Sequence, residues 1–169
     1  MQASSGLRMQ AVPQPSSLYM AANLLLQKFP APEFSAETVV DTTDLRSGER
    51  AGLIVFGEDY AWLGIERLGA QRSLVLRAAE QAQEGRPEAV AFSEPWSGAQ
   101  VTLRLRVAAG AHYRFAVGEG DKVRDVGPTF QAKPGRWVGA KVGLFAAART
   151  DAAETGSASF ARFTVSAVR

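Results

Sequence analysis

His112 is the only histidine of the chain, and there is no cysteine. A serine-type triad would need this histidine beside a hydroxyl nucleophile and a carboxylate, but the sequence contains no nucleophile elbow. A zinc site is not expected either, because one histidine without cysteine leaves too few strong ligands. His112 follows a small-residue turn and precedes Tyr113 and Phe115 in a strand pattern, so we interpret it as a surface histidine at a strand edge.

Paired carboxylates are the other route to catalysis, since glycoside hydrolysis needs only two carboxyl groups about 5 to 10 Å apart. The chain has 17 acidic residues. None forms the Glu-x-Asp-x-Glu alternation that places three acids on one face of a strand in sandwich-fold glucanases. Glu58 and Asp59 are adjacent, so a strand would point them to opposite faces, and between Gly57 and Tyr60 they predict a hairpin turn. No catalytic residue is predicted.

Oxygen ligands for a calcium ion could come from four acidic residues together with backbone carbonyls. Their spacing matches no EF-hand loop. We therefore predict no cofactor, with a structural calcium ion as the alternative. The four candidate ligands are Asp121, Asp125, Asp151 and Glu154.

Tryptophan side chains are what a sugar-binding surface would use, because the C–H faces of pyranose rings stack on aromatic rings. Trp62 and Trp137 stand inside apolar strand patterns, where filling the core is the expected role. Trp96 lies in the polar, turn-rich stretch 93–98 and is expected to be exposed. Trp96 is therefore the candidate for contact with a glycan or a partner domain. The alternative is a rim tryptophan that covers an edge of the fold.

Length, charge and hydropathy exclude several classes of protein. The 169 residues suffice for one core, so we predict one domain over residues 1–169, with residues 1–20 partly irregular. The 19 basic and 17 acidic residues alternate without forming a block, and no recognised motif is present, so nucleic acid is not expected as a partner. No apolar run approaches the roughly 18 residues of a membrane span, so no membrane contact is expected.

The N-terminal residues bear on the compartment. Residues 1–8 carry one positive charge and no apolar segment before a cleavage site, so they do not form a signal peptide. Either the protein stays inside the cell or the chain is the tail of a longer one whose start is missing, and we favour the second. Such a parent protein could be exported, so the compartment stays open, as does the oligomeric state.

Alternation of apolar and polar residues dominates the chain. Residues 101, 103, 105 and 107 are apolar and alternate with Thr102, Arg104 and Arg106, as in a half-buried antiparallel strand. Residues 162–167 repeat the pattern near the C-terminus. Further short strands are expected at residues 7–12, 37–42, 53–56, 60–65, 74–76, 113–117 and 142–145.

Turn formers rich in glycine separate these runs at short spacing. Many short strands with regular turns indicate an all-β, antiparallel two-sheet sandwich of the jelly-roll type. Residues 77–88 have helix-friendly composition but no apolar stripe, so a polar loop or frayed strand is expected there. The expected core consists of Leu53, Val55, Leu63, Ile65, Leu103, Leu105, Phe115, Val142, Leu144 and Phe163.

Six segments in a fixed order resemble a known module. They lie at residues 23–30 (NLLLQKFP), 34–38 (FSAET), 51–63 (AGLIVFG, then DYAWL), 126–130, 135–145 (GRWVGAKVGLF) and 158–165. Together they make nearly the whole chain similar to the C-terminal concanavalin A-like module of family 43 glycoside hydrolases, the β-xylosidase and α-arabinofuranosidase group.

This resemblance implies a role without catalysis by the chain itself. In that family a five-bladed β-propeller holds the catalytic carboxylates, and the sandwich packs against it and helps to shape its pocket. The resemblance implies a non-catalytic accessory module of a hydrolase that degrades xylan or arabinan, with the propeller as partner and an oligosaccharide as a further ligand. The alternative is a free-standing, lectin-like carbohydrate-binding domain. A docking module should carry a large apolar patch, and a lectin a concave face with exposed aromatic rings.

The sequence departs from the family pattern at its start. The propeller is absent, and so is the Trp-rich strand that in relatives precedes the part matching residues 5–12. Without that strand, one sheet is expected to expose an unpaired edge. No site residue is transferred from the family, and the specificity for sugar and linkage is not predicted.

Overall fold

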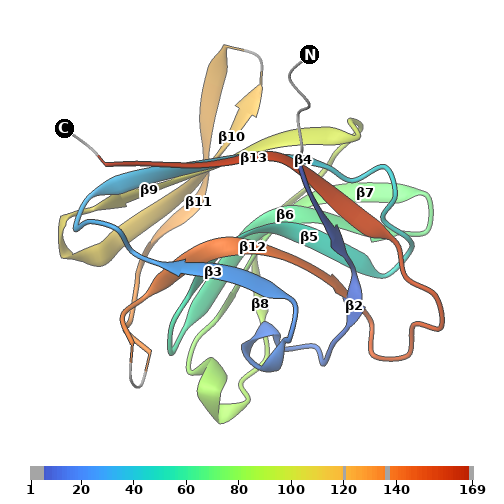
Figure 1. Ribbon diagram of the computed structural model, residues 1–169, viewed down its shortest axis with the longest axis horizontal. Helices are drawn as coiled ribbons and strands as arrows, with labels where there is room; N and C mark the ends of the chain where they lie inside the picture. The colour runs from blue at the N-terminus through green and yellow to red at the C-terminus, as the bar shows by residue number, and fades with distance from the viewer. Residues whose placement is uncertain (1–5, 120, 136–137, 168–169) are drawn as a thin grey trace.

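The structure, a computed structural model, describes residues 6–119, 121–135 and 138–167. Two β-sheets pack face to face as a sandwich (Figure 1). Helical structure in these residues is limited to the short 3-10 turns η1 (Leu18–Met20), η2 (Ala82–Glu84) and η3 (Ala109–Ala111). No helix among them is long and apolar enough to cross a membrane. The predicted fold class, an antiparallel two-sheet sandwich, is confirmed.

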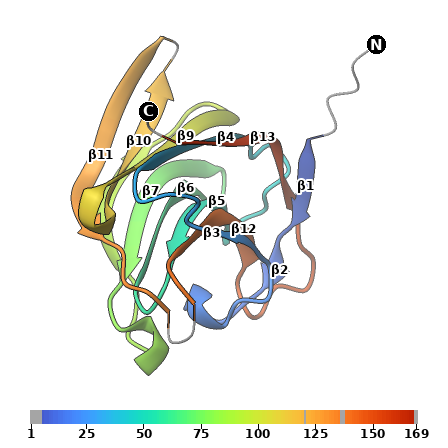
Figure 2. The same cartoon turned by 60° about the vertical axis from the view of Figure 1, so that its left-hand side comes forward.

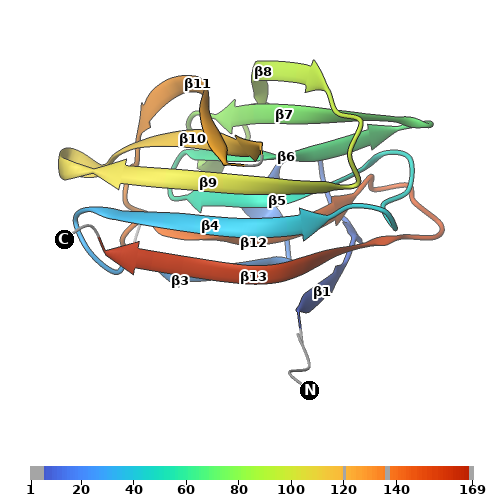
Figure 3. The same cartoon turned by 90° about the horizontal axis from the view of Figure 1, so that it is seen from above.

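The six-stranded sheet has the order β1-β13-β4-β9-β10-β11, and every neighbouring pair is antiparallel. Figure 3 looks onto this sheet from outside, with β13, β4 and β9 side by side. Its strands are β1 (Leu7–Gln10), β13 (Ser157–Ala167), β4 (Phe34–Asp41), β9 (Gln100–Ala108), β10 (His112–Glu119) and β11 (Lys122–Gln131).

The seven-stranded sheet has the order β2-β12-β5-β6-β7-β8, and β3 also pairs with β12. Along one edge of β12, β3 pairs antiparallel at residues 141–145, and β2 pairs parallel at Ala147 and Ala148. Its strands are β2 (Val12–Pro13), β3 (Leu24–Lys28), β12 (Lys141–Ala148), β5 (Glu49–Phe56), β6 (Tyr60–Leu68), β7 (Gln71–Ala79) and β8 (Ala89–Pro95).

The main core lies between the two sheets and is built from the inward-facing residues of alternating strands. Nine of the ten expected core residues are buried there, and Phe163 is half-buried and packs against the same cluster. The hairpin turn expected at Glu58 and Asp59 is also present, because these residues connect β5 to β6. Residues 77–88 end β7 and continue as a loop through η2, as expected from their missing apolar stripe.

Three strands were not expected from alternation alone, namely β3, β8 and β11. The strand expected at residues 7–12 is divided into β1 and β2, which belong to different sheets. At the break, the Ala11 amide donates to the Gly156 carbonyl (2.9 Å). Beyond β1, the outer edge of β13 at residues 162–167 has no strand partner among the described residues. This agrees with the expected unpaired edge.

A second apolar cluster covers the outer face of the seven-stranded sheet. Trp62 packs edge-on against Phe145 with 5.1 Å between ring centroids, and Leu18 from η1 lies over them, fully buried. Strands buried on both faces lose their alternation, which explains the almost continuous apolar runs of β5, β6 and β12. Trp62 therefore fills a core, as expected, but the outer one.

Glu49, the first residue of β5, joins two loops through a buried carboxylate with only 1% of the residue exposed. One carboxylate oxygen accepts from the Arg46 amide (2.7 Å), in the loop after β4. The other accepts from the Gly156 amide (2.7 Å), just before β13. A carboxylate that accepts two backbone N–H groups forms charge-assisted hydrogen bonds, which are stronger than neutral ones.

Replacing Glu49 should therefore weaken the fold. In Glu49→Gln the side-chain amide can accept from only one of the two amides, and its NH₂ group faces the other, so we expect a loss of about 1–3 kcal/mol in the free energy of unfolding. Urea unfolding followed by tryptophan fluorescence measures this. Glu154→Gln, which removes an exposed ion pair with Arg46, is the control and should leave the midpoint nearly unchanged. Equal midpoints for the two variants would contradict the role of Glu49.

Candidate functional site

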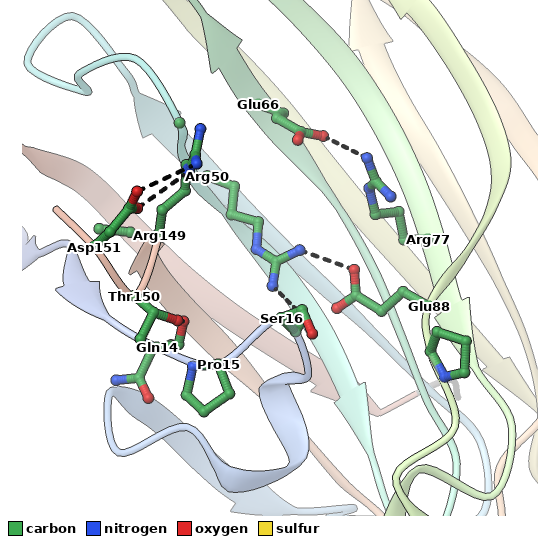
Figure 4. A pocket seen from close by; sticks show the side chains of 13 residues that line it. Gln14, Pro15, Ser16, Arg50, Glu66, Arg77, Glu88, Arg149, Thr150 and Asp151 are labelled. Carbon is green, nitrogen blue, oxygen red and sulfur yellow. Dashed lines mark hydrogen bonds and ion pairs between the residues drawn. The ribbon is translucent and has the colours of Figure 1, made fainter.

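One polar hollow is a pocket of about 560 Å³ on the outer face of the seven-stranded sheet. Its wall combines the segment before η1, strands β5, β6 and β7, the loop before β8 and the end of β12. Figure 4 shows Arg50 in the middle of this pocket, between Ser16 and Glu88. The pocket joins parts of the chain that are distant in sequence, so its geometry depends on the sandwich being closed.

Glu88 forms the floor of the pocket, with only 5% of its side chain exposed. One carboxylate oxygen accepts from the Tyr60 hydroxyl (2.7 Å) and from Trp62 Nε1 (3.2 Å). The other accepts from the Arg50 guanidinium (2.8 Å). The buried carboxylate is thus fully engaged by one cationic and two neutral donors, as a buried charge requires.

Arg50 connects this floor to the N-terminal segment. Its guanidinium donates to the Ser16 carbonyl (2.8 Å) and lies 5.4 Å from the centroid of the Trp62 ring, which is a cation–π distance. The Tyr60 hydroxyl makes a second connection by accepting from the Leu18 amide (2.9 Å). The network therefore fixes the covering segment onto the sheet and satisfies the polar atoms of Tyr60 and Trp62.

The upper part of the pocket holds two further ion pairs. Arg77 pairs with Glu66 (3.0 Å), and Arg149 pairs with Asp151 (3.3 Å). Three arginines of the pocket are therefore balanced by three carboxylates, so the pocket carries no net charge. Such a surface can form hydrogen bonds with a neutral polar ligand but does not select for an anion or a cation.

The acidic side chains of the pocket can be compared with the requirements of glycosidase chemistry. That chemistry needs one carboxyl group as proton donor to the leaving oxygen and a second as base or nucleophile. Glu66 and Glu88 both already accept hydrogen bonds from arginine guanidinium groups. Glu58 and Asp59 lie in the β5–β6 turn, where Asp59 accepts from the Gln81 amide (2.7 Å) and pairs with Lys133 (2.7 Å). This carboxylate orders loops.

The remaining sequence candidates lie apart from the pocket floor. His112 is exposed at the start of β10, where Nδ1 lies 3.2 Å from the Ala109 carbonyl oxygen. It stands at the end of a strand in the interior of the sheet, not on a sheet edge. Trp96 was expected to be exposed, but it is half-buried against the main core, and its Nε1 donates to the Gln100 carbonyl (3.3 Å). Trp137 lies outside the described residues.

The four calcium candidates divide between two parts of the fold. Asp121 and Asp125 belong to the β10–β11 hairpin, and Asp125 pairs with Arg114 (3.4 Å). Asp151 and Glu154 lie between β12 and β13 and pair with arginines. Within the part of the chain that the structure describes, no three His, Cys, Asp or Glu side chains are grouped as metal ligands.

Sequence reasoning missed Glu88 and Arg50, the residues that organise the pocket. Glu88 ends a polar loop and Arg50 follows Glu49 in a strand, so neither position carries a local signal. Trp62 and Tyr60 did offer one, because a fully buried tryptophan or tyrosine needs a partner for its polar atom. That requirement predicts an acceptor near the pair but not which residue supplies it.

The buried hydroxyls predict a loss of stability in alkaline solution. Burial, and to a smaller extent the Glu88 carboxylate, raise the pKa of Tyr60 above its usual value. Burial, followed by Asp59, likewise raises the pKa of Tyr113. The folded chain thus retains protons that the unfolded chain releases near pH 10, so stability is present below about pH 10 and falls as the pH rises above it.

Urea midpoints measured between pH 8 and pH 11.5 test this expectation. The midpoint should fall above about pH 10 in the native chain, and the fall should be smaller in the double variant Tyr60→Phe/Tyr113→Phe. Tyr19→Phe is the control, because Tyr19 is half-buried and its hydroxyl has no hydrogen bond among the described residues. A double variant with the same alkaline slope as the native chain would contradict the assignment.

Comparisons with known proteins identify the module. The family model described as the β-xylosidase C-terminal concanavalin A-like domain matches residues 2–166. No curated protein sequence matches the chain. Among solved structures, a bifunctional GH43-CE protein of Bacteroides eggerthii is similar, with 20% identity and a TM-score of 0.85 over 97% of this chain and 21% of that one.

Two further structures extend the comparison. A xylan β-1,4-xylosidase from Bacillus halodurans C-125 has 17% identity and a TM-score of 0.77 over 95% of this chain and 32% of that one. The Bacteroides ovatus protein named Xyloglucan PUL GH43B has 16% identity and a TM-score of 0.78, over 99% and 34%. At these identities the likeness shows the fold, and the chain spans about a third or less of each of these proteins. The family match extends over nearly the whole sequence, and the chain therefore belongs to the family of β-xylosidase C-terminal concanavalin A-like domains.

Proposed function

We propose that this chain is the non-catalytic accessory module of a family 43 glycoside hydrolase, which packs against a catalytic β-propeller and completes its substrate pocket. The observation that carries the proposal is the unequal coverage in the comparisons. The Bacteroides eggerthii and Bacillus halodurans structures match 97% and 95% of this chain but only 21% and 32% of their own. Most of the length of each relative lies outside the matched sandwich and is long enough to contain a catalytic domain.

The contacts of the described carboxylates favour a non-catalytic role for this chain. The carboxylates of the candidate pocket accept from arginines, and Asp59 accepts from a backbone amide and pairs with Lys133. Glycoside hydrolysis needs one carboxyl group as proton donor and a second as base or nucleophile. In this proposal the catalytic carboxylates, and with them the specificity for xylan or arabinan, belong to the partner domain.

A free-standing carbohydrate-binding domain is the alternative, and aromatic exposure argues against it. A sugar-stacking platform needs exposed rings, yet every aromatic side chain that the structure describes is buried or half-buried. Trp96, half-buried at the β8–β9 connection, remains our candidate for contact with a partner domain or a glycan. In a complex with the propeller or with an oligosaccharide, its fluorescence should change.

The intact mass of the native protein in its source cells is the first experiment. A mass above 18.1 kDa by the size of a propeller would support an accessory module, and that longer protein would then be assayed. A native mass of about 18.1 kDa would contradict the proposal in favour of the free-standing alternative, and glycan binding by the Trp96→Ala variant would be measured next.

We expect the chain alone to be inactive toward aryl β-xylosides and aryl α-arabinofuranosides, because Glu66 and Glu88 of the candidate pocket already accept hydrogen bonds from arginines. Release of nitrophenol from both substrates is measured against a buffer blank. Glu66→Gln and Glu88→Gln accompany the native chain, since they remove the two carboxylates of the pocket. Turnover that exceeds the blank and is lost in either variant would overturn the non-catalytic role.

A further inference from the structure

Four arginines gather on the outer face of the six-stranded sheet, although the sequence spreads them over three strands. Arg104 and Arg106 alternate on β9, and Arg114 lies directly opposite Arg106 on β10. Arg162, on β13, pairs with Glu37, which is also the partner of Arg104. We call these four residues the arginine face.

The arginine face contains a juxtaposition that costs stability. Side chains directly opposite on antiparallel strands have Cβ atoms about 4.5–5.5 Å apart, and like charges at such positions repel. Arg114 is held by Asp125 (3.4 Å) and by the Gly127 carbonyl (3.3 Å). Arg106, in contrast, is exposed and has no hydrogen bond or ion pair to any residue that the structure describes. An anion at this place would remove the repulsion.

The charge at this face is unbalanced, unlike that of the pocket around Arg50. The four arginines face two carboxylates, Glu37 and Asp125. The face therefore has an excess of two positive charges, which equals the net charge of the whole chain.

The β10–β11 hairpin makes this face hollow. Three residues of β11, 127–129, lie opposite Arg114 alone, because the register shifts between the pairs that flank it. Such a bulge bends and twists its strand, and Gly127 adopts a positive φ of 70° within it. Figures 1 and 2 show the hairpin rising away from the sheet. The result is a pocket of about 570 Å³ lined by β4, β9, β10 and β11.

We propose that this hollow binds an acidic sugar through its carboxylate, with Arg106 and Arg114 as the anion-binding residues. Guanidinium groups bind carboxylates with two parallel hydrogen bonds, and the volume suits one or two sugar rings. The Ser35 hydroxyl and the Glu37 carboxylate line the same hollow and offer partners for sugar hydroxyls, and Val123 offers an apolar wall.

A uronic acid fits better than a polyanion. The excess of two charges is small, and the described residues offer no exposed aromatic ring on which nucleobases could stack. The choice of a sugar over other carboxylates rests on the proposed function, whereas the anion site itself rests on the charges. Binding of the free monosaccharide should be weak, with Kd on the order of 1 mM, and weaker at high salt.

Titration of the ¹⁵N-labelled 169-residue chain by NMR tests the proposal. D-Glucuronate should cause saturable shifts in amides of residues 104–106, 114–116 and 123–125, and D-glucose, which lacks the carboxylate, should not. Arg106→Gln should weaken glucuronate binding about tenfold or more. Arg86→Gln, which removes an exposed arginine of the loop before β8, is the matched control and should bind as the native chain does.

The outcomes separate the parts of the inference. Absence of shifts at the arginine face with 20 mM glucuronate, about 20 times the expected Kd, would overturn it. Equal binding of inorganic phosphate, acetate and glucuronate would overturn the sugar and leave only a general anion site. The Arg106 side chain has no hydrogen bond or ion pair to a described residue, so its variant should retain the native spectrum elsewhere. The intact-mass and turnover experiments do not depend on this site, so the proposed function can fail or hold separately.

Discussion

Burial of the seven-stranded sheet on both faces is the constraint on which the structure depends. A sheet in a sandwich needs only its inner face covered, but here Trp62 and Tyr60 project from the outer face and are fully buried. Their polar atoms must then find partners inside the fold, because an unpaired buried polar atom costs about 1–3 kcal/mol. Glu88 accepts from both, and its own charge requires Arg50. Burial of the outer face therefore requires a series of polar contacts, which ends at the Ser16 carbonyl.

The inner half of the fold could be predicted from the sequence, and the outer half could not. Alternation locates the residues of the main core because each inward position repeats every second residue, and only Phe163 is less buried than expected. Strand β11 was missed because Gly127 and Pro128 break its pattern at the bulge. The outer cover depends on a contact between Leu18 and Tyr60, 42 residues apart. The continuous apolar runs of β5 and β6 signal a second buried face, but not what covers it.

The positions of the charged residues likewise depend partly on spacing along one strand and partly on pairing between strands. The alternation of Arg104 and Arg106 is visible in the sequence and places both on one face of β9. The approach of Arg114 depends on the register of β9 against β10, and that of Arg162 on the register of β13 against β4. A chain with nearly equal numbers of acidic and basic residues can therefore still present a face with an excess of one sign. Composition bounds the total charge but does not place it.

The two outer faces are therefore suited to different roles. Chain segments cover the outer face of the seven-stranded sheet. The charged side chains of the pocket beside this cover are paired with one another, so they mainly hold the covering segments in place. The six-stranded sheet leaves its outer face uncovered, and the bulge at Gly127 turns a hairpin up beside it. Like charges directly opposite each other on neighbouring strands are destabilising. In this fold Glu37 and Asp125 offset three of the four arginines, and Arg106 has no ion pair with a described residue, which is why we propose that an external anion binds there.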